Sequence, residues 1–600
     1  MCPGQAQTEL PARCHGFEFS FEMDKTMMRP VFPSCLLLSA AMLLSSTLVA
    51  EETRAAEESV PTDRLLPPQV VAYVTVPSAS KLKDGWQGSS YGRIFSDPKL
   101  ADFRDDVLKN IKTSTKGLQK DIGLTLDELL AIPSGEVSFA IVHPPAGKVA
   151  LVAFLEFGES GQAVDSLLDK VSEKLTAAEM KRKESEFDDT SITSFVKQPD
   201  ATADPKRGVG SGRNVSWFVR DSTLVISSEV AALESVLVRW DGEHARTFAE
   251  SRVYEYIVER CSDDDEALLY WYVDPIGLYK SVIALAGPAG AQLSAGLFVV
   301  PMLGLDKLKA LGGSMDLGGE KYDSIARTVA YVDGPPSGLL AALQFSAEEQ
   351  RPPRWVSAET TRYFTLNWDV EAAYTAIESV VDSFQQPGTL QKMLDGMVAN
   401  DGRLHRKTDV IDQLSGKVHV AIDLPRPDDP TSMRALVAVG VKDEKKMQGV
   451  LTTLAKDPTF PGKVREFQGA TLYELPIRGA GTAAISVVGG QIVFSNSVQR
   501  LEQVIRRDSD RRTLAQSDAF QRLVREIPSK TSFLGFQTED GQLRVVYEAL
   551  RNGTQEAPSE GIDFEKLPAF SAIEKYLKPS LSYAVPDKNG VLFVTFSLQE

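Results

Sequence analysis

A chain of 600 residues with 43% apolar and 24% charged residues has an ordinary globular composition and is long enough for several domains. Its formal charge of −17 and pI near 5.0 create a field that repels phosphate backbones, and no stripe of Lys and Arg compensates locally. We therefore expect a folded protein without nucleic acid among its partners.

The start of the chain predicts export. Arg29 precedes an apolar run at 35–43, and the small residue Ala50 ends the segment before an acidic pair. This pattern is typical of a secretory signal, and the apolar core is short for a membrane-spanning helix. We expect an N-terminal extension and signal over residues 1–50, with an uncleaved anchor as the alternative, and a periplasmic or extracellular mature protein. The polar residues 51–66 predict a linker.

Beyond the linker, strands and helices alternate. Residues 70–76 are rich in β-branched side chains and predict a strand, and apolar residues at helical spacing follow over 100–107. Two apolar segments, 137–141 and 149–155, are separated by a proline-bearing turn and predict a hairpin. An amphipathic helix is expected at 163–175.

The same series of elements occurs twice. Thr-Phe-Ala-Glu-Ser at 247–251 returns as Thr-Leu-Ala-Gln-Ser at 513–517, each at the start of a helix with a matching apolar set. Ser-Gly-Glu-Val at 134–137 returns as Ser-Gly-Lys-Val at 415–418, each at the start of a strand. Because the matched stretches keep one order, we interpret the chain as one architectural unit written twice.

Hairpins that alternate with single amphipathic helices predict antiparallel sheets with helices packed on one face, which is an α+β fold. We therefore predict two tandem related α+β units, at residues 67–350 and 351–600.

One segment breaks the repeat. Residues 281–305 contain no charged side chain but carry four glycines and two prolines, which make a poor spanning helix. One interpretation is a buried helical hairpin; the other is an exposed apolar patch or pocket wall that meets a lipid, a ligand or a partner, with membrane contact but no span. The side chains that would form this surface are Val282, Ile283, Leu285, Leu293, Leu297, Phe298, Val299, Met302 and Leu303.

No catalytic, cofactor or metal site is predicted. Cys261 alone follows the leader, and the acidic residues at 263–265 should raise the pKa of its thiol. The histidines are scattered singly, and His419 alternates with valines on a strand, where we expect it to face solvent. The paired aspartates lie in turns and indicate solvated loops. An enzyme of unrecognised type is therefore a lesser alternative to a non-catalytic protein.

The order of elements resembles that of large exported proteins of unknown function from planctomycete-type bacteria. The resemblance is carried by the leader, by Leu66-Pro67-Pro68 before a strand, by Asp97-Pro98 and by the repeated Gly-(Glu/Lys)-Val strands. It implies export and an envelope setting, and no activity, cofactor or catalytic residue.

The resulting hypothesis is an exported, non-catalytic binding or scaffolding protein of the bacterial cell envelope. Its partner would be an envelope protein or an apolar ligand. The alternative is a carrier that shelters an apolar ligand or lipid between a curved sheet and its helices, with residues 281–305 as a wall.

Overall fold

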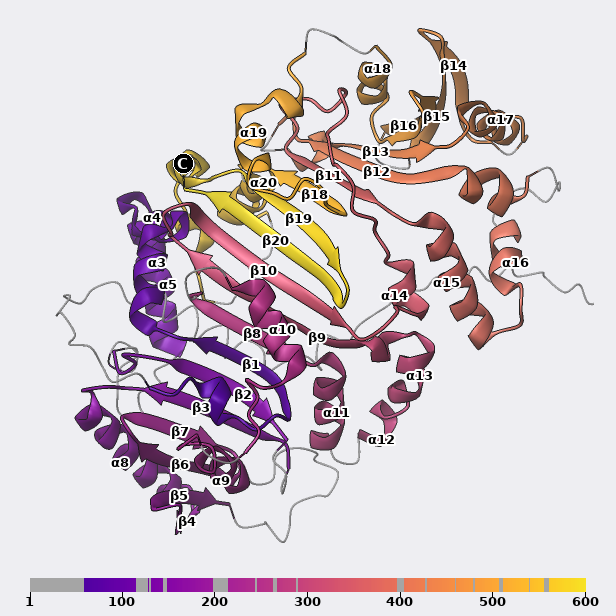
Figure 1. Cartoon of the computed structure of the whole chain (residues 1–600). Helices are drawn as coiled ribbons and strands as arrows, with labels where there is room; N and C mark the ends of the chain where they lie inside the picture. Colours follow the sequence, from indigo (N-terminus) through magenta and orange to yellow (C-terminus); the bar gives the residue numbers. More distant parts are fainter. Residues whose placement is uncertain are drawn as a thin grey trace, which may run out of the picture. The chain divides into compact units, whose positions relative to one another are not determined.

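The computed structural model describes residues 59–599 apart from 115–127, 129–130, 144–147, 198–213, 243–244, 263–266, 287–289, 397–403, 427–428, 459, 478–480, 507–510, 539 and 555–560. Twenty strands in this part of the chain pair in one antiparallel sheet (Figure 1). The first ten strands are β1 (Val70–Val76), β2 (Val137–Val142), β3 (Ala150–Glu156), β4 (Lys181–Phe187), β5 (Thr190–Val196), β6 (Val215–Arg220), β7 (Thr223–Ser227), β8 (Leu269–Val273), β9 (Leu308–Leu317) and β10 (Tyr322–Val332). The other ten are β11 (Arg362–Asn367), β12 (Leu414–Asp423), β13 (Arg434–Val441), β14 (Lys463–Phe467), β15 (Ala470–Ile477), β16 (Gly481–Val488), β17 (Gln491–Ser495), β18 (Phe533–Gln537), β19 (Ser580–Asp587) and β20 (Gly590–Leu598). The predicted α+β fold with antiparallel strands is confirmed.

The pairing pattern of β1–β10 recurs in β11–β20. Across the sheet the strands follow the order β4-β5-β6-β7-β3-β2-β1-β8-β9-β10, and then β20-β19-β18-β11-β12-β13-β17-β16-β15-β14. The pairing of β10 with β20 joins the two series, and all of the described residues belong to one compact unit. The two series of strands thus share one sheet. The predicted division into two units at residue 350 stays a prediction.

Four helices cover one face of the sheet, which we call the covered face. They are α9 (Val230–Leu237), α10 (Arg252–Cys261), α18 (Val498–Arg506) and α19 (Asp518–Val524). Helix α10 buries Tyr254, Ile257 and Cys261, which recur at the spacing of one helical face. These side chains pack against Tyr73 and Tyr272 of the central strands, so the main core lies on this side.

Two helices lie on the opposite face, each over outer strands. Helix α8 (Gly161–Ala177) packs with Trp217, Leu224 and neighbouring apolar residues of β6 and β7. Helix α17 (Glu444–Ala455) packs in the same way with residues of β15 and β16, including Tyr473 and Val487. The expectation that helices pack on one face is therefore wrong for these outer strands.

The remaining helices lie near the ends of the strands. After β1 come α3 (Ala79–Gly88), α4 (Ser90–Ser96) and α5 (Ala101–Ser114); α5 contacts the short helix η8 (Phe564–Lys566), which in turn contacts α20 (Asp540–Arg551). Beyond β8, β10 and β11 are α11 (Pro275–Leu285), α12 (Gly290–Leu293), α13 (Gly296–Met302), α14 (Gly338–Ala342), α15 (Val370–Phe384) and α16 (Thr389–Gly396) (Figure 1).

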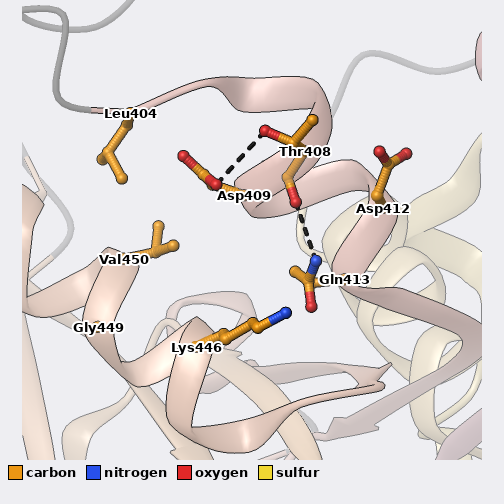
Figure 2. Close-up of a pocket in the computed structure, with 8 residues that line it drawn as sticks. All are labelled: Leu404, Thr408, Asp409, Asp412, Gln413, Lys446, Gly449 and Val450. Atoms are coloured by element: carbon orange, nitrogen blue, oxygen red, sulfur yellow. Dashed lines mark hydrogen bonds between the residues drawn. The ribbon is translucent and has the colours of Figure 1, made fainter.

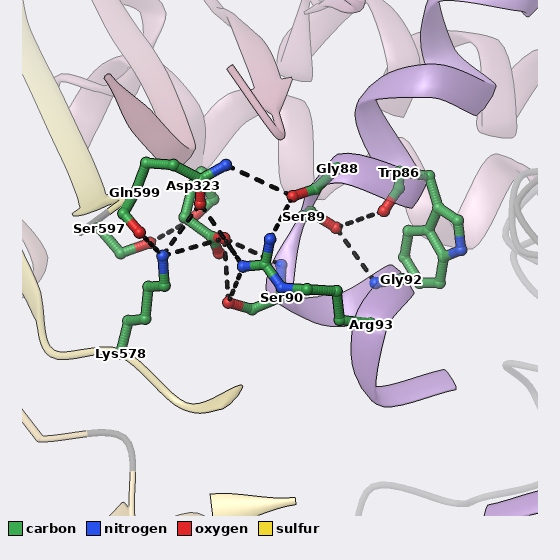
Figure 3. A network of polar contacts seen from close by, with 11 residues as sticks. Trp86, Gly88, Ser89, Ser90, Gly92, Arg93, Asp323, Lys578, Ser597 and Gln599 are labelled. Carbon is green, nitrogen blue, oxygen red and sulfur yellow. Dashed lines mark hydrogen bonds and ion pairs between the residues drawn. The ribbon is translucent and has the colours of Figure 1, made fainter. Parts of the chain in front are cut away.

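A buried carboxylate ties α4 to the end of the sheet (Figure 3). Asp323 on β10 accepts hydrogen bonds from the amide and the hydroxyl of Ser90, both at 2.9 Å, and from Arg93 at 2.8 Å. The Lys578 ammonium lies 3.6 Å from the same oxygen and donates to Gln599 at 2.9 Å. The network joins residues more than 200 positions apart, so it stabilises tertiary structure rather than a local turn.

The end of the predicted linker belongs to the fold. Leu65 and Leu66 are buried, and the short helix α2 (Thr62–Leu65) lies against the sheet. Both the amide and the hydroxyl of Thr62 donate to the Glu136 carboxylate, which also accepts from Thr75 at 2.6 Å. Burial raises the pKa of Glu136. The linker prediction is therefore wrong for residues 62–66, since these bonds hold them in place.

Candidate apolar binding surface

The predicted apolar segment forms three short helices, α11, α12 and α13. Helix α11 begins after Asp274, whose side chain accepts a hydrogen bond from the Gly277 amide at 2.8 Å, with Pro275 at the first helical position. Pro301 lies inside α13, and Gly304 follows with φ of 71°, a left-handed conformation that suits glycine. These residues keep each helix short.

Most of the predicted surface residues are exposed. Phe298 is 79% exposed and Leu285 is 52% exposed, and Val282, Leu293 and Met302 are also exposed. The other four predicted residues, Ile283, Leu297, Val299 and Leu303, are half-buried. The interpretation of this segment as a buried helical hairpin is therefore wrong. A role of these residues in binding stays a prediction.

The exposed apolar residues continue onto α14. The amide of Leu339 donates to the Leu303 carbonyl at 2.8 Å, which places the start of α14 beside the end of α13. Leu339 and Leu343 are exposed as well. We call these seven side chains the α11–α14 surface: Val282, Leu285, Leu293, Phe298, Met302, Leu339 and Leu343. Soluble proteins seldom expose contiguous large apolar patches unless the patch meets a partner or a membrane.

The matching place in the second series is partly covered. There the segment after β18 forms α20 and η8, and its side chains Tyr547, Leu567 and Phe570 are buried together with Leu100 near the start of α5. These three residues of the matching segment therefore have partners within the chain, whereas Leu543 and Val546 of α20 are exposed. The α11–α14 surface is instead exposed.

A second apolar surface lies on the face of the central strands opposite α10 and α19. Directly paired residues of a sheet point to the same side, so the register defines one row across ten strands. The row consists of Phe139, Val74, Trp271, Gly313, Thr328, Phe593, Ala584, Phe533, Leu366 and Val418. We call this row, together with the apolar residues beside it, the open face. It contains no charged side chain.

The open face is exposed at Phe593 but not throughout, since Ala584 of the same row is only 5% exposed. Phe593 is 39% exposed, whereas its chain neighbour Val594, which points to the covered face, is 1% exposed. Among the described residues, none of the row packs into a core cluster under a helix. Phe533 contacts two other rings of this face, Phe364 and Phe593, with centroids 6.1 and 5.5 Å away. The row is therefore a mostly apolar part of the sheet that lies between the strands under α8 and those under α17.

The sequence carries a signal for this surface that did not lead to a prediction. Strands that read as near-continuous apolar runs, such as 149–155 and 591–597, are typical of sheets covered on both faces. Helices were predicted on one face of the sheet only, and no contact was predicted for the apolar residues of the other face.

A cleft lined by both polar and apolar side chains lies elsewhere (Figure 2). It measures about 660 Å³ and lies between α17 and the segment formed by η4 (Arg406–Val410) and η5 (Ile411–Gln413). Its Asp409 carboxylate accepts from the amide of His405 at 2.8 Å and so stabilises its own turn. A second cleft of about 470 Å³ lies beside Arg220, which pairs with Asp188 at 3.2 Å. Neither cleft is lined by the α11–α14 surface.

His419 is buried, which contradicts the expectation that it faces solvent. The register pairs it with Thr365 and turns it toward the covered face, where its Nδ1 lies 2.9 Å from the Tyr363 hydroxyl. Burial, with a smaller contribution from the positive charge of Lys417, lowers the pKa of His419 from 6.5 to about 4. The imidazole is thus neutral at pH 7 and contributes to the packing of the covered face.

Because His419 is buried in its neutral form, the free energy of unfolding should depend on pH. Between pH 6.5 and about 4 the unfolded chain binds a proton at His419 that the folded chain does not bind. The contribution of the neutral imidazole to the free energy of unfolding is therefore lost as the pH falls through this range. The expected loss is about 3 kcal/mol. Urea denaturation from pH 7 to pH 4 should show a flatter profile for His419→Gln than for the wild type, and parallel profiles would contradict the assignment.

Cys261 is buried as well. Burial raises the pKa of its thiol to about 12. The predicted direction agrees with this, but the main cause is burial, and the acidic residues at 263–265 lie outside the described residues. Within the described ranges, no group of three or more His, Cys, Asp and Glu is placed to hold a metal ion, and no helix is long and apolar enough to cross a membrane.

Comparison with known proteins identifies a family over part of the chain. Residues 357–560 match a family described as "Protein of unknown function (DUF3352)". The match includes β11–β18 and the cleft of Figure 2, and it excludes α11–α14 and the first ten strands. No curated protein and no solved structure shows significant similarity to the chain. The description names no activity.

Proposed function

We propose that the protein is an exported, non-catalytic binding protein of the bacterial cell envelope that docks on an anionic lipid surface through the α11–α14 surface. The observation that carries the proposal is the exposure of its large apolar side chains, above all Phe298 at 79%. Burial of a large apolar side chain contributes about 1.5–3 kcal/mol, so several of them can hold a protein at a bilayer interface.

The charges around this surface favour a lipid partner. No charged residue occurs between 281 and 305; the exposed Lys280 precedes this stretch, and Asp306, Lys307 and the exposed Lys309 follow it. Apolar side chains bordered by lysines suit the boundary between acyl chains and anionic headgroups, where each basic residue adds about 1 kcal/mol. Short helices interrupted by Gly and Pro can lie in that boundary without spanning it. A scaffold that binds an envelope protein is the alternative, and nothing in the geometry favours it over lipid.

Vesicle flotation tests the proposal. The mature protein should float with vesicles of phosphatidylglycerol and phosphatidylcholine, more weakly at high salt because lysine attraction is screened. The double variant Leu285→Ser with Phe298→Ser should lose at least tenfold in partitioning, since two large apolar anchors are removed.

The matched control is Val238→Ser with Val464→Ser, which removes side chains that are 45% and 48% exposed away from this surface. The control should float like the wild type. A wild type that stays in the bottom fraction, or a double variant that floats as well as the control, would contradict the proposal.

A further inference from the structure

We infer that two copies of this chain dimerise by antiparallel pairing of their β4 strands, with Arg182 of each copy opposite a glutamate of the other. Strand β4 lies at the outer end of the sheet (Figure 1) and pairs along its whole length with β5. Among the described strands, no other pairs with it. Its residues from 181 to 186 are all exposed. An edge strand of this kind presents unpaired N–H and C=O groups to a further strand.

The charges of β4 are ordered by sign. Lys181, Arg182 and Lys183 form its first half, and Glu184 and Glu186 lie in its second half. Charged residues on an edge strand usually prevent pairing with other strands. This order instead favours one partner, because an antiparallel second copy brings the basic half of one strand beside the acidic half of the other. The strand is thus complementary to itself, as the contact of a twofold-symmetric dimer requires.

The turn at the end of β4 determines which backbone groups are free. Asp188 and Asp189 have φ of 50° and 51°, as in the two-residue turns that close β-hairpins. Phe187 and Thr190 therefore flank the turn as a hydrogen-bonded pair, and every second residue back from Phe187 bonds to β5. The backbone groups of the residues between them, at positions 182, 184 and 186, point to the free edge.

These free groups allow two registers that match the charges. With the twofold axis at Lys183, Arg182 lies opposite Glu184 of the second copy; with the axis at Glu184, Arg182 lies opposite Glu186. Each register brings one residue beside its own copy at the axis. Lys183 has the longer and more flexible side chain, so its two ammonium groups can separate more easily than two glutamates. We therefore place the axis at Lys183.

The side chains that would form the intermolecular pairs are accessible. Arg182 donates to Glu184 of its own chain at 2.7 Å, and both side chains are more than half exposed. In the dimer each would also face its counterpart on the second copy, with Cβ atoms about 4.5–5.5 Å apart. Four charges would then alternate in sign across the contact.

The other edge strand of the sheet, β14, does not show this order. Its Arg465 is held within its own chain by Glu474 and Glu502, both at 2.5 Å. A contact between β4 of one copy and β14 of the next would also repeat without closing and give filaments. Pairing of β4 with itself is the contact that gives a finite assembly.

Disulfide crosslinking tests the contact. After the predicted leader the chain contains Cys261 alone, which is buried, so an introduced cysteine reports on β4. In the Lys183→Cys variant the two Cα atoms would lie about 4.5 Å apart, within the range that a disulfide bridges. Mild oxidation should therefore give a covalent dimer on a non-reducing gel. Ser185→Cys is the matched control, because the two copies of residue 185 would lie about 14 Å apart along the strands.

Charge reversal tests the pairing in solution. The wild type should be a dimer in light scattering, and Arg182→Glu should weaken dimerisation at least tenfold, because it opposes two glutamates at two places. Adding Glu184→Arg to this variant should restore the dimer, since the charges are then exchanged. Lys445→Glu, an exposed charge reversal on α17, should dimerise like the wild type.

Four results would overturn the inference. They are a monomeric wild type, filaments in place of dimers, equal crosslinking of Lys183→Cys and Ser185→Cys, and a double reversal that dimerises as weakly as Arg182→Glu. A disulfide at Glu184→Cys in place of Lys183→Cys would overturn the position of the axis. The vesicle variant with Leu285→Ser and Phe298→Ser should still dimerise, so the outcomes at the two surfaces are distinguishable.

Discussion

Asp423→Asn should lower the free energy of unfolding by about 3–5 kcal/mol, the usual cost of removing one partner from a buried ion pair. Arg500 is only 2% exposed, and its Nε lies 2.6 Å from the Asp423 carboxylate. Burial lowers the pKa of Arg500, and Asp423 offsets part of that effect. Asparagine keeps the shape of the side chain but removes its charge, so the guanidinium would stay buried without a counter-ion.

A double-mutant cycle separates the ion pair from the packing. Arg500→Met combined with Asp423→Asn should recover most of the loss, because it removes the buried charge and fills much of the same volume. Urea denaturation at pH 7 measures all three variants. A loss below about 1 kcal/mol for Asp423→Asn, as seen for exposed pairs, would show that the pair is hydrated.

Phe248→Ala should destabilise the protein by about 3–5 kcal/mol, because it leaves a cavity in the main core. Phe248 is fully buried, and its ring centroid lies 4.0 Å from that of Tyr254 and 5.0 Å from that of Tyr272. Thermal or urea denaturation measures the loss. Phe298→Ala is the matched control, since the same deletion at a side chain 79% exposed should change stability by about 0.5 kcal/mol or less. Similar losses for both variants would contradict the assignment of the core.

The repeated segments 247–251 and 513–517 illustrate what local pattern predicts well. Each precedes a helix whose apolar residues recur every three or four positions, and both helices pack on the covered face. The first residue of each apolar set, Phe248 and Leu514, is fully buried. Such periodicity is a property of a few consecutive residues, so it can be recognised in the sequence before the partner strands are known.

His419 illustrates what local pattern misses. Its alternation with valines was interpreted as a solvent-facing position. The side of the strand that carries His419 holds the polar Lys417 and Asp423 but also the buried Ala421, so alternation alone could not assign the faces. The register with Thr365 on β11 determines which side of the sheet the imidazole meets. The open face was not predicted for the same reason, since it is defined by residues such as Val74 and Phe593, which lie 519 positions apart in the chain.

The sequence by itself determined the strands, the amphipathic helices, the recurrence of their order and the uncharged apolar segment 281–305, because each is written in consecutive residues. Only the tertiary structure decided that large side chains of this segment are exposed, that β10 pairs with β20, and that, among the residues the structure describes, no open-face residue of the row joins a core cluster under a helix. These outcomes depend on which distant elements meet. A strand with apolar residues on both sides is compatible with a covering helix on either side, so the choice is made by the packing of the whole chain.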